Sequence, residues 1–229
     1  MDIIEETTGE IPETTTLDRI TGMDAAKRAL EVSLAGAHPM IFLYNGNSQA
    51  VELVKAGKRI AEKHGLAFHG LAYPACNCGN FGSRTGHCTC KRSSVRHHLA
   101  KLGRREHQVD IWLDACRAKL PEIGAEPDEP ETVTAERILT AGKLPKEKTE
   151  PEKEAMELLN AWQKHVGRTV NTGRILKVAG TIARIEGNSG EIRAYHMAEA
   201  IQYQVQSVSW LWDCLAPQLV ELKNKTGKR

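Results

Sequence analysis

Four cysteines lie close together between Cys76 and Cys90, and this stretch constrains the fold more than any other part of the chain. They form two Cys-x-Cys pairs, Cys76-Asn-Cys78 and Cys88-Thr-Cys90, which are separated by a short loop rich in glycine. Four thiolates brought together in this way match the all-cysteine composition of a closed, tetrahedral structural zinc site. The pattern therefore predicts zinc binding at Cys76, Cys78, Cys88 and Cys90.

Two disulfides, or four ordinary reduced cysteines, are the alternatives to a metal site. Nothing else in the sequence indicates an oxidising compartment, and cysteines that serve only burial have no reason to pair around glycines. His87 could replace a missing thiolate, but we interpret it as a loop residue. Cys116 and Cys214 stand alone and are interpreted as core or incidental thiols.

The composition is that of a folded protein in water. Of the 229 residues, 41% are hydrophobic and 26% are charged. A chain of this length can bury a core in one domain or in two small ones. The N-terminal residues Met1–Glu6 lack the basic and apolar regions of a signal peptide, and no apolar run is long enough to cross a bilayer. We therefore expect a cytoplasmic protein that has no membrane partner.

A basic run follows the cysteines, although the formal net charge of +2 predicts no general attraction to nucleic acid. Its cationic residues are Lys91, Arg92, Arg96, Lys101, Arg104 and Arg105. A helix from Ser93 to about Leu102 would carry most of them, which makes the run a candidate phosphate-facing element for DNA. A solvated helix face is the equally weighted alternative. The run has no interleaved aromatic residues, so base stacking is not indicated.

A strand–helix–strand unit is expected before the cysteines. The apolar run Met40–Tyr44 follows Pro39 and precedes Asn45-Gly46-Asn47, which indicates a buried strand and a turn. A helix capped by Ser48 and a second strand-like run at Leu66–Tyr73 come next. This is a β-α-β unit of the minimum workable size, and its two strands should be parallel.

The other elements are expected to be mainly helical. A capping box at Thr21–Asp24 predicts the start of a helix before the unit, and Val109–Leu113 is a further strand candidate. Later helices are expected near Thr134–Ala141 and at Glu152–Val166, Thr172–Glu186 and Ala194–Cys214. We interpret Trp210 and Trp212 as core residues, with an exposed docking patch as the alternative. The expected organisation is a flexible acidic tail (1–16), a core (17–120) with the cysteine loop (76–90), a Pro-, Glu- and Lys-rich linker (121–151) and a helical domain (152–229).

Several blocks of the chain resemble the ComM-type AAA+ proteins, which are relatives of the magnesium chelatase I subunit. Leu17–Glu31 looks like the opening segment of that family, and Pro74–Gly82 with His87–Cys90 looks like its cysteine insertion. Arg174–Ala183 and His196–Tyr203 resemble its C-terminal lid, the magnesium-chelatase-like helical domain. The resemblance implies a P-loop core followed by a lid, assembly into rings, and the handling of recombining DNA.

The residues that bind and hydrolyse ATP in that family are missing here. A Walker A loop would follow the first strand, but Asn45–Ala50 has one glycine and no Gly-Lys-Ser/Thr. The stretch for the magnesium-binding acidic pair is absent, and Pro74 and Val170 stand at the sensor and lid-arginine positions. Phosphoryl transfer relies on positioned charges and metal, so we expect no ATP hydrolysis. Gly46, Asn47 and Ser48 retain only weak anion binding at a helix N-terminus, and ATP is not an expected cofactor.

The expected fold is α/β plus all-α: a reduced P-loop-like β-α-β remnant with a four-cysteine loop, followed by a helical lid-like bundle. The expected function is that of a catalytically inactive AAA+-derived adaptor or regulator. It would bind DNA, a full-length AAA+ protein or a second copy of itself through the zinc-stabilised loop and the basic segment.

The alternative from another class is an ATP-dependent Mg-chelatase-like or ComM-like subunit. Its active site would be completed by a partner chain, with Arg137 or Arg105 as the arginine finger. A small enzyme built around Cys116, Asp114 and His107 and a decayed coding fragment are the remaining alternatives.

Overall fold

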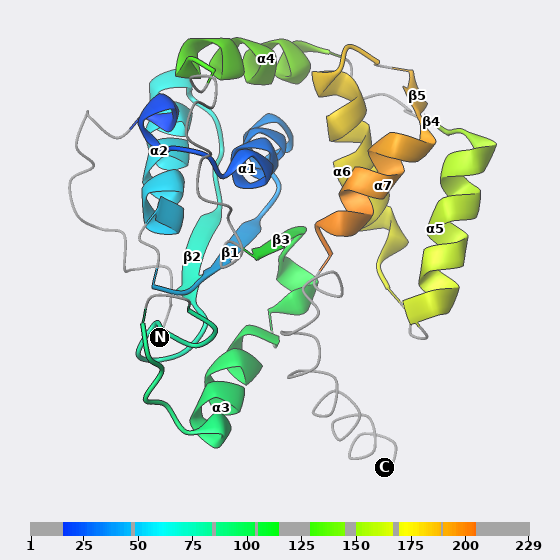
Figure 1. The fold of residues 1–229 in the computed structure, drawn as a ribbon. Helices are drawn as coiled ribbons and strands as arrows, with labels where there is room; N and C mark the ends of the chain where they lie inside the picture. Colours follow the sequence, from blue (N-terminus) through cyan, green and yellow to red (C-terminus); the bar gives the residue numbers. More distant parts are fainter. Residues whose placement is uncertain are drawn as a thin grey trace.

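The computed structural model describes residues 16–46, 49–83, 86–103, 105–114, 129–144, 150–166, 170–188 and 190–204. The helices are α1 (Asp24–Gly36), α2 (Gln49–His64), α3 (Arg92–Gly103), α4 (Glu131–Lys143), α5 (Lys153–Val166), α6 (Thr172–Ile185) and α7 (Ala194–Gln202). The strands are β1 (Met40–Tyr44), β2 (Gly70–Pro74), β3 (Ile111–Asp114), β4 (Glu150–Pro151) and β5 (Glu191–Ile192). Figure 1 shows a small sheet with helices on both sides of it.

The main sheet has three parallel strands in the order β2-β1-β3. The predicted β-α-β unit with parallel strands is confirmed, and α2 is its crossover helix. The second strand begins at Gly70, not at Leu66 as the apolar run predicted. Its partner β1 begins at Met40, which pairs with Gly70, and the preceding Pro39 has no N–H to extend the ladder.

Successive strand residues point to opposite sides of this sheet, and both of its faces are buried. Met40, Phe42 and Ile111 belong to a large cluster, which we call the main core; it includes residues of α1, α2 and α4–α7. Ile41, Leu43, Tyr73, Cys76, Val95, Leu99, Leu102 and Trp112 form a second cluster on the other face. The second cluster is closed by α3 and the cysteine loop, and Trp112 is buried there.

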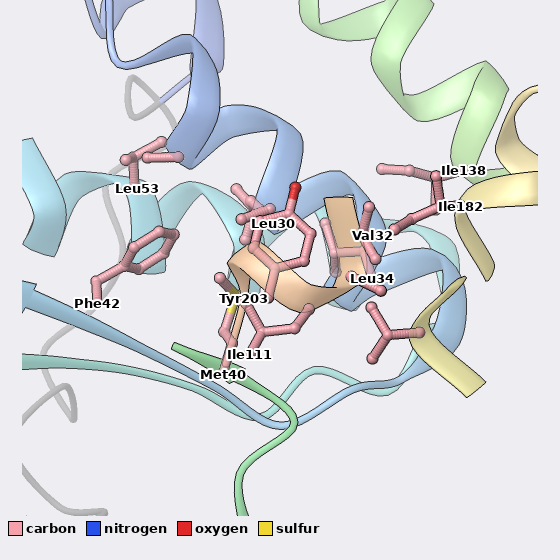
Figure 2. Packing of buried hydrophobic residues seen from close by; sticks show 14 of the residues in the cluster. Leu30, Val32, Leu34, Met40, Phe42, Leu53, Ile111, Ile138, Ile182 and Tyr203 are labelled. Atoms are coloured by element: carbon pink, nitrogen blue, oxygen red, sulfur yellow. The ribbon is translucent and has the colours of Figure 1, made fainter. Parts of the chain in front are cut away.

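Helix α1 lies between the sheet and the helices α4 and α6 (Figure 1). The helical spacing of Met23, Ala26, Leu30 and Leu34 in the sequence indicates one apolar face. The helix is buried more widely, because it has neighbours on opposite sides: Val32 and Glu31 are buried as well. Figure 2 shows side chains of α1 packed between the sheet and the later helices.

The predicted capping box at the start of α1 is wrong. The N-cap residue is Met23, with a left-handed φ of 62°, and none of the described side chains caps the helix. Gly22 also has a positive φ, of 68°, so the chain turns sharply just before Asp24. Thr21 precedes this turn, and its hydroxyl therefore does not reach the first helical amides.

Helix α4 lies within the stretch expected to be a linker. It confirms the short helix predicted near Thr134–Ala141, with longer bounds, and it packs against α1 and α6. Its Ile138 is 1% exposed and belongs to the main core. Residues from the expected sheet-containing part and from the expected C-terminal part therefore share one hydrophobic cluster.

The chain after α7 closes the main core. Figure 2 shows Tyr203 among Leu30, Met40 and Ile111. Its carbonyl oxygen accepts a hydrogen bond of 2.7 Å from the Trp112 amide on the outer edge of β3. Helix α7 ends at Gln202, and the predicted continuation to Cys214, with Trp210 and Trp212, lies outside the described residues.

Charged side chains join α1, α4, α6 and α7 beside the main core. The Glu31 carboxylate, 4% exposed, lies 3.1 Å from Arg28 Nη1 and 2.7 Å from Arg137 Nε. Arg28 also contacts Glu199 through Nε (3.0 Å) and Glu186, just after α6, through Nη2 (3.1 Å). A buried carboxylate is stable only when it is paired and hydrogen-bonded, so these contacts restrict how the helices meet.

His38 links the loop before β1 to α6. Its Nδ1 lies 3.1 Å from Asp110 Oδ2 and its Nε2 lies 2.8 Å from Thr181 Oγ1. The imidazole ring fills the space beside Gly36, where an added Cβ would lie 2.2 Å from His38 Nε2 and 2.6 Å from Thr181 Oγ1. Only glycine fits at this position without displacing the ring.

Replacing Glu31 by glutamine should lower the free energy of unfolding by about 1–3 kcal/mol, because two partly buried guanidinium groups lose their shared carboxylate. Chemical denaturation measures the effect. Glu62→Gln is the matched control: that side chain is 63% exposed and lies 3.9 Å from Lys58. The control should change stability by less than about 0.5 kcal/mol, and equal losses in both variants would contradict a structural role of the Glu31 network.

Replacing Gly36 by alanine should destabilise the fold by about 1–3 kcal/mol, because the new methyl group displaces the His38 ring from its partners. Gly142→Ala is the control, since nothing lies within 4 Å of a Cβ added there. Helix propensity predicts that the control is neutral or stabilising by up to about 1 kcal/mol. A thermal melt of both variants separates the two effects, and a Gly36→Ala protein as stable as the control would show that the ring is not held.

Candidate metal centre

The cysteine loop begins where β2 ends, at the carboxyl end of the sheet. The Ala75 amide donates to the Tyr44 carbonyl oxygen at 2.7 Å, which places Cys76 in the second cluster with 0% exposure. Gly79 and Gly82 have left-handed φ values of 76° and 75°, which glycine adopts without a steric penalty. These turns let the chain reverse, so that the second cysteine pair meets the first.

The four sulfur atoms form one group. Cys76 Sγ lies 3.3 Å from Cys78 Sγ and 3.7 Å from Cys88 Sγ, and the Sγ atoms of Cys78 and Cys88 are 3.7 Å apart. Cys90 completes the group, in which all ligand atoms lie within 4.8 Å of one another. All four residues are free thiols, and the cluster can hold a metal ion. The exposed His87 is not part of it.

Backbone amides and neighbouring thiols set the electrostatics of this cluster. A backbone hydrogen bond from Asn80, aided by the Cys76 thiol, lowers the pKa of Cys78 to about 5. A backbone hydrogen bond from Cys90 acts in the same sense on Cys88, but burial and the adjacent Cys78 and Cys76 thiols outweigh it and raise the pKa of Cys88 to about 12. Four thiols this close cannot all ionise unless a cation offsets their charge, which is the environment that a metal ion relieves.

The loop also covers the turn between β1 and α2. The Gly46 amide donates to the Gly79 carbonyl oxygen at 2.8 Å, and Asn45 Nδ2 donates to the Phe81 carbonyl oxygen at 3.2 Å. The Phe81 amide in turn donates to Cys76 Sγ at 3.2 Å. The turn, the loop and one ligand are therefore joined by a continuous set of hydrogen bonds. The sequence pattern did not indicate these contacts, because they depend on how the loop folds back over the sheet.

The predicted weak anion site falls on this turn. Its Gly46 amide is already hydrogen-bonded to Gly79 within the protein. Asn47 and Ser48 lie outside the described residues, so anion binding there stays a prediction.

Helix α3 presents its basic side chains to solvent. It buries Val95, Leu99 and Leu102 in the second cluster. Its exposed cationic residues, together with the residue before it, are Lys91, Arg92, Arg96 and Lys101, which we call the basic face. Within the described part of the chain, none of these four pairs with a carboxylate. Arg105 is half-buried beyond the helix, and Arg104 lies outside the described residues.

His98 fixes α3 to β2. The sequence did not indicate this role, because His98 stands within the basic run. Its Nε2 lies 2.8 Å from the Pro74 carbonyl oxygen, so this nitrogen carries the proton. The Tyr73 hydroxyl donates to the His98 carbonyl oxygen at 3.0 Å, and the two rings are 4.6 Å apart. The helix is therefore anchored by polar contacts as well as by its apolar side.

Asp110, His38 and Thr181 have the connectivity of a hydrolase triad, with a carboxylate and a hydroxyl on the two nitrogens of one imidazole. Thr181 is 1% exposed and His38 is 5% exposed, so a substrate carbonyl cannot reach the hydroxyl. In this structure the three residues serve to join the loops around β1 and β3 to α6.

Arg137 and Cys116 belong to the other predicted sites, and the structure describes only the first of them. Arg137, a candidate arginine finger, donates from Nη1 and Nη2 to Glu129 at 2.6 Å each and from Nε to Glu31. This pairing lowers the pKa of Glu129. Cys116, the candidate nucleophile of a small enzyme, lies outside the described residues.

Replacing Cys88 by serine should reduce the metal bound by the purified protein from about one ion per chain to less than about half an ion, because a closed site needs all four thiolates. Elemental analysis and thiol titration under reducing conditions measure this. His87→Ala is the matched control and should retain the metal. Wild-type protein with less than about half an equivalent of metal and four freely titratable loop thiols would refute the site.

No protein-family model matches the chain, and neither the curated proteins nor the solved structures contain a match. The resemblance to ComM-type AAA+ proteins therefore stays a hypothesis based on the residues quoted above. Across the described ranges, the helices are too short or too polar to span a bilayer.

Proposed function

We propose that this chain is a non-catalytic adaptor that binds DNA through the basic face of α3, and that a zinc ion in the cysteine loop holds this helix in place. The observation that carries the proposal is the orientation of α3. The helix buries its apolar side in the second cluster and turns Arg92, Arg96 and Lys101 to solvent. The exposed Lys91 lies between it and Cys90, the last cysteine of the loop.

Zinc is the metal that suits the four thiolates best. In a tetrahedral site with Zn–S bonds of about 2.3 Å, neighbouring sulfur atoms are about 3.8 Å apart. The Sγ separations of 3.3, 3.7 and 3.7 Å are close to this value. An iron–sulfur cluster places several metal ions between its thiolates and would need a wider group than one whose ligand atoms lie within 4.8 Å. Four protein ligands leave no open position for a substrate, so the proposed role of the zinc is structural.

The basic face suits the DNA backbone rather than base edges. Arg92 and Arg96 are one helical turn apart and therefore neighbours on the surface. With 12 residues, α3 is about 18 Å long, enough to follow several phosphates. Residues 91–103 contain no acidic side chain that would weaken the positive potential. Cations on such a face bind phosphates and carry no direct sequence information.

The proposed second partner is a full-length AAA+ protein. A second copy of this chain is the alternative occupant of the same surface. Support comes from Arg174–Ala183 and His196–Tyr203, which resemble the lid of ComM-type AAA+ proteins. The first block lies in α6, and the second covers most of α7 and the residue that follows it. In this proposal the chain contributes binding surfaces, and the partner contributes ATP hydrolysis.

The DNA proposal predicts binding that depends steeply on salt. If the four cations of the basic face each contact a phosphate, raising the salt from about 50 to 200 mM should weaken binding about 150-fold. Fluorescence anisotropy with a labelled 20-bp duplex measures the affinity. The double variant Arg96→Gln, Lys101→Gln should bind more weakly and lower the slope of log K against log salt by about two.

The matched control is Lys58→Gln, Lys63→Gln on α2, which removes the same charge from another surface. Its affinity and salt slope should stay near those of the wild type. Equal losses in the two double variants would indicate a general charge effect rather than a basic face, and no binding at low salt would refute the DNA proposal.

A further inference from the structure

We infer that the metal ion is the switch that keeps α3 docked: its loss should release α3 and the cysteine loop from the sheet while the main core stays folded. The inference rests on the metal site of the proposed function and adds a conformational consequence. Only the metal-loaded protein would then present the basic face on a fixed helix.

The metal ligands are themselves part of the packing under α3. Cys76 is fully buried in the second cluster, and Cys78, Cys88 and Cys90 pack against that cluster together with Phe81. The sulfur atoms stay within 3.3–3.7 Å of one another in the folded loop. Without the cation, the four ligands lose the central atom that holds the two cysteine pairs of the loop together. Removing the metal therefore disturbs the apolar cluster as well as the loop.

The start of α3 is tied closely to the ligands. Only Lys91 separates the ligand Cys90 from the first helical residue, Arg92, and the Lys91 carbonyl oxygen accepts from the Val95 amide at 3.0 Å. The position of the metal therefore determines where the helix begins. A helix of 12 residues is marginal in water when it is not packed, so α3 depends on this placement and on its three buried side chains.

The effect should reach the turn between β1 and α2. The Gly46 amide is held by the Gly79 carbonyl oxygen, and Asn45 is held by Phe81. Both acceptors lie between the two cysteine pairs. If the loop opens, these two contacts are lost together with the contact between His98 and Pro74.

The rest of the protein has separate support. Helices α5, α6 and α7 belong to the main core, and the second cluster contains none of their described residues. The buried Glu31 and its arginine partners connect α1, α4 and α7 without involving the loop. Opening is therefore expected to be local, as in other proteins whose elements differ in stability.

Hydrogen exchange of the full chain, followed by mass spectrometry, tests this inference. The protein is compared with bound zinc and after chelation, both under reducing conditions. The amides of Val95–Leu102, Phe81 and Gly46 should exchange at least about tenfold faster without zinc, while those of α6 and α7 should be unchanged. Cys88→Ser should reproduce the chelated pattern in the presence of zinc, and His87→Ala should keep the zinc-bound pattern.

The outcomes separate this inference from the proposed function. Zinc that binds at about one ion per chain, but whose removal leaves exchange in α3 unchanged, would overturn the switch and leave the zinc site intact. Faster exchange in α6 and α7 as well would overturn the local character of the opening. A protein that binds no zinc would refute both proposals.

Discussion

A parallel sheet of three short strands has two apolar faces, and neither can be left in water. This constraint accounts for most of the structure. One face is covered by α1 and α2, and the later helices extend that cluster into the main core. Within the described ranges, the other face is covered by α3 and the cysteine loop. The cysteine loop, whose candidate metal ligands also serve as packing residues, therefore helps to bury this apolar face of the sheet.

Buried polar groups determine how the helices meet around this sheet. Glu31 holds Arg28 and Arg137 from α1 and α4, and His38 joins Asp110 to Thr181. Such groups contribute little net stability when they are fully paired, but a wrong arrangement would leave a charge or a donor unsatisfied in the interior. They therefore select one packing of the helices among those that bury a similar apolar area.

The carboxyl end of a parallel sheet is the usual place for a ligand in α/β proteins. Here the chain places its own cysteine loop there, and the Gly46 amide donates to a carbonyl oxygen of that loop. The Gly46 amide is therefore occupied within the protein, whereas Asn47 and Ser48 lie outside the described residues. The same contacts connect the candidate metal site to the turn, so the turn is expected to respond to metal binding together with α3.

The sequence by itself determined the local elements and the composition of the metal cluster. An apolar run between Pro39 and Asn45-Gly46 predicts a buried strand, and β1 occupies Met40–Tyr44 as predicted. Two Cys-x-Cys pairs around glycines likewise predicted the group of four sulfur atoms. The tertiary structure alone decided the strand order β2-β1-β3, the burial of Glu31 and the anchoring of α3 by His98. These features depend on partners that are distant along the chain, whereas periodicity and spacing report only what a residue does relative to its own neighbours.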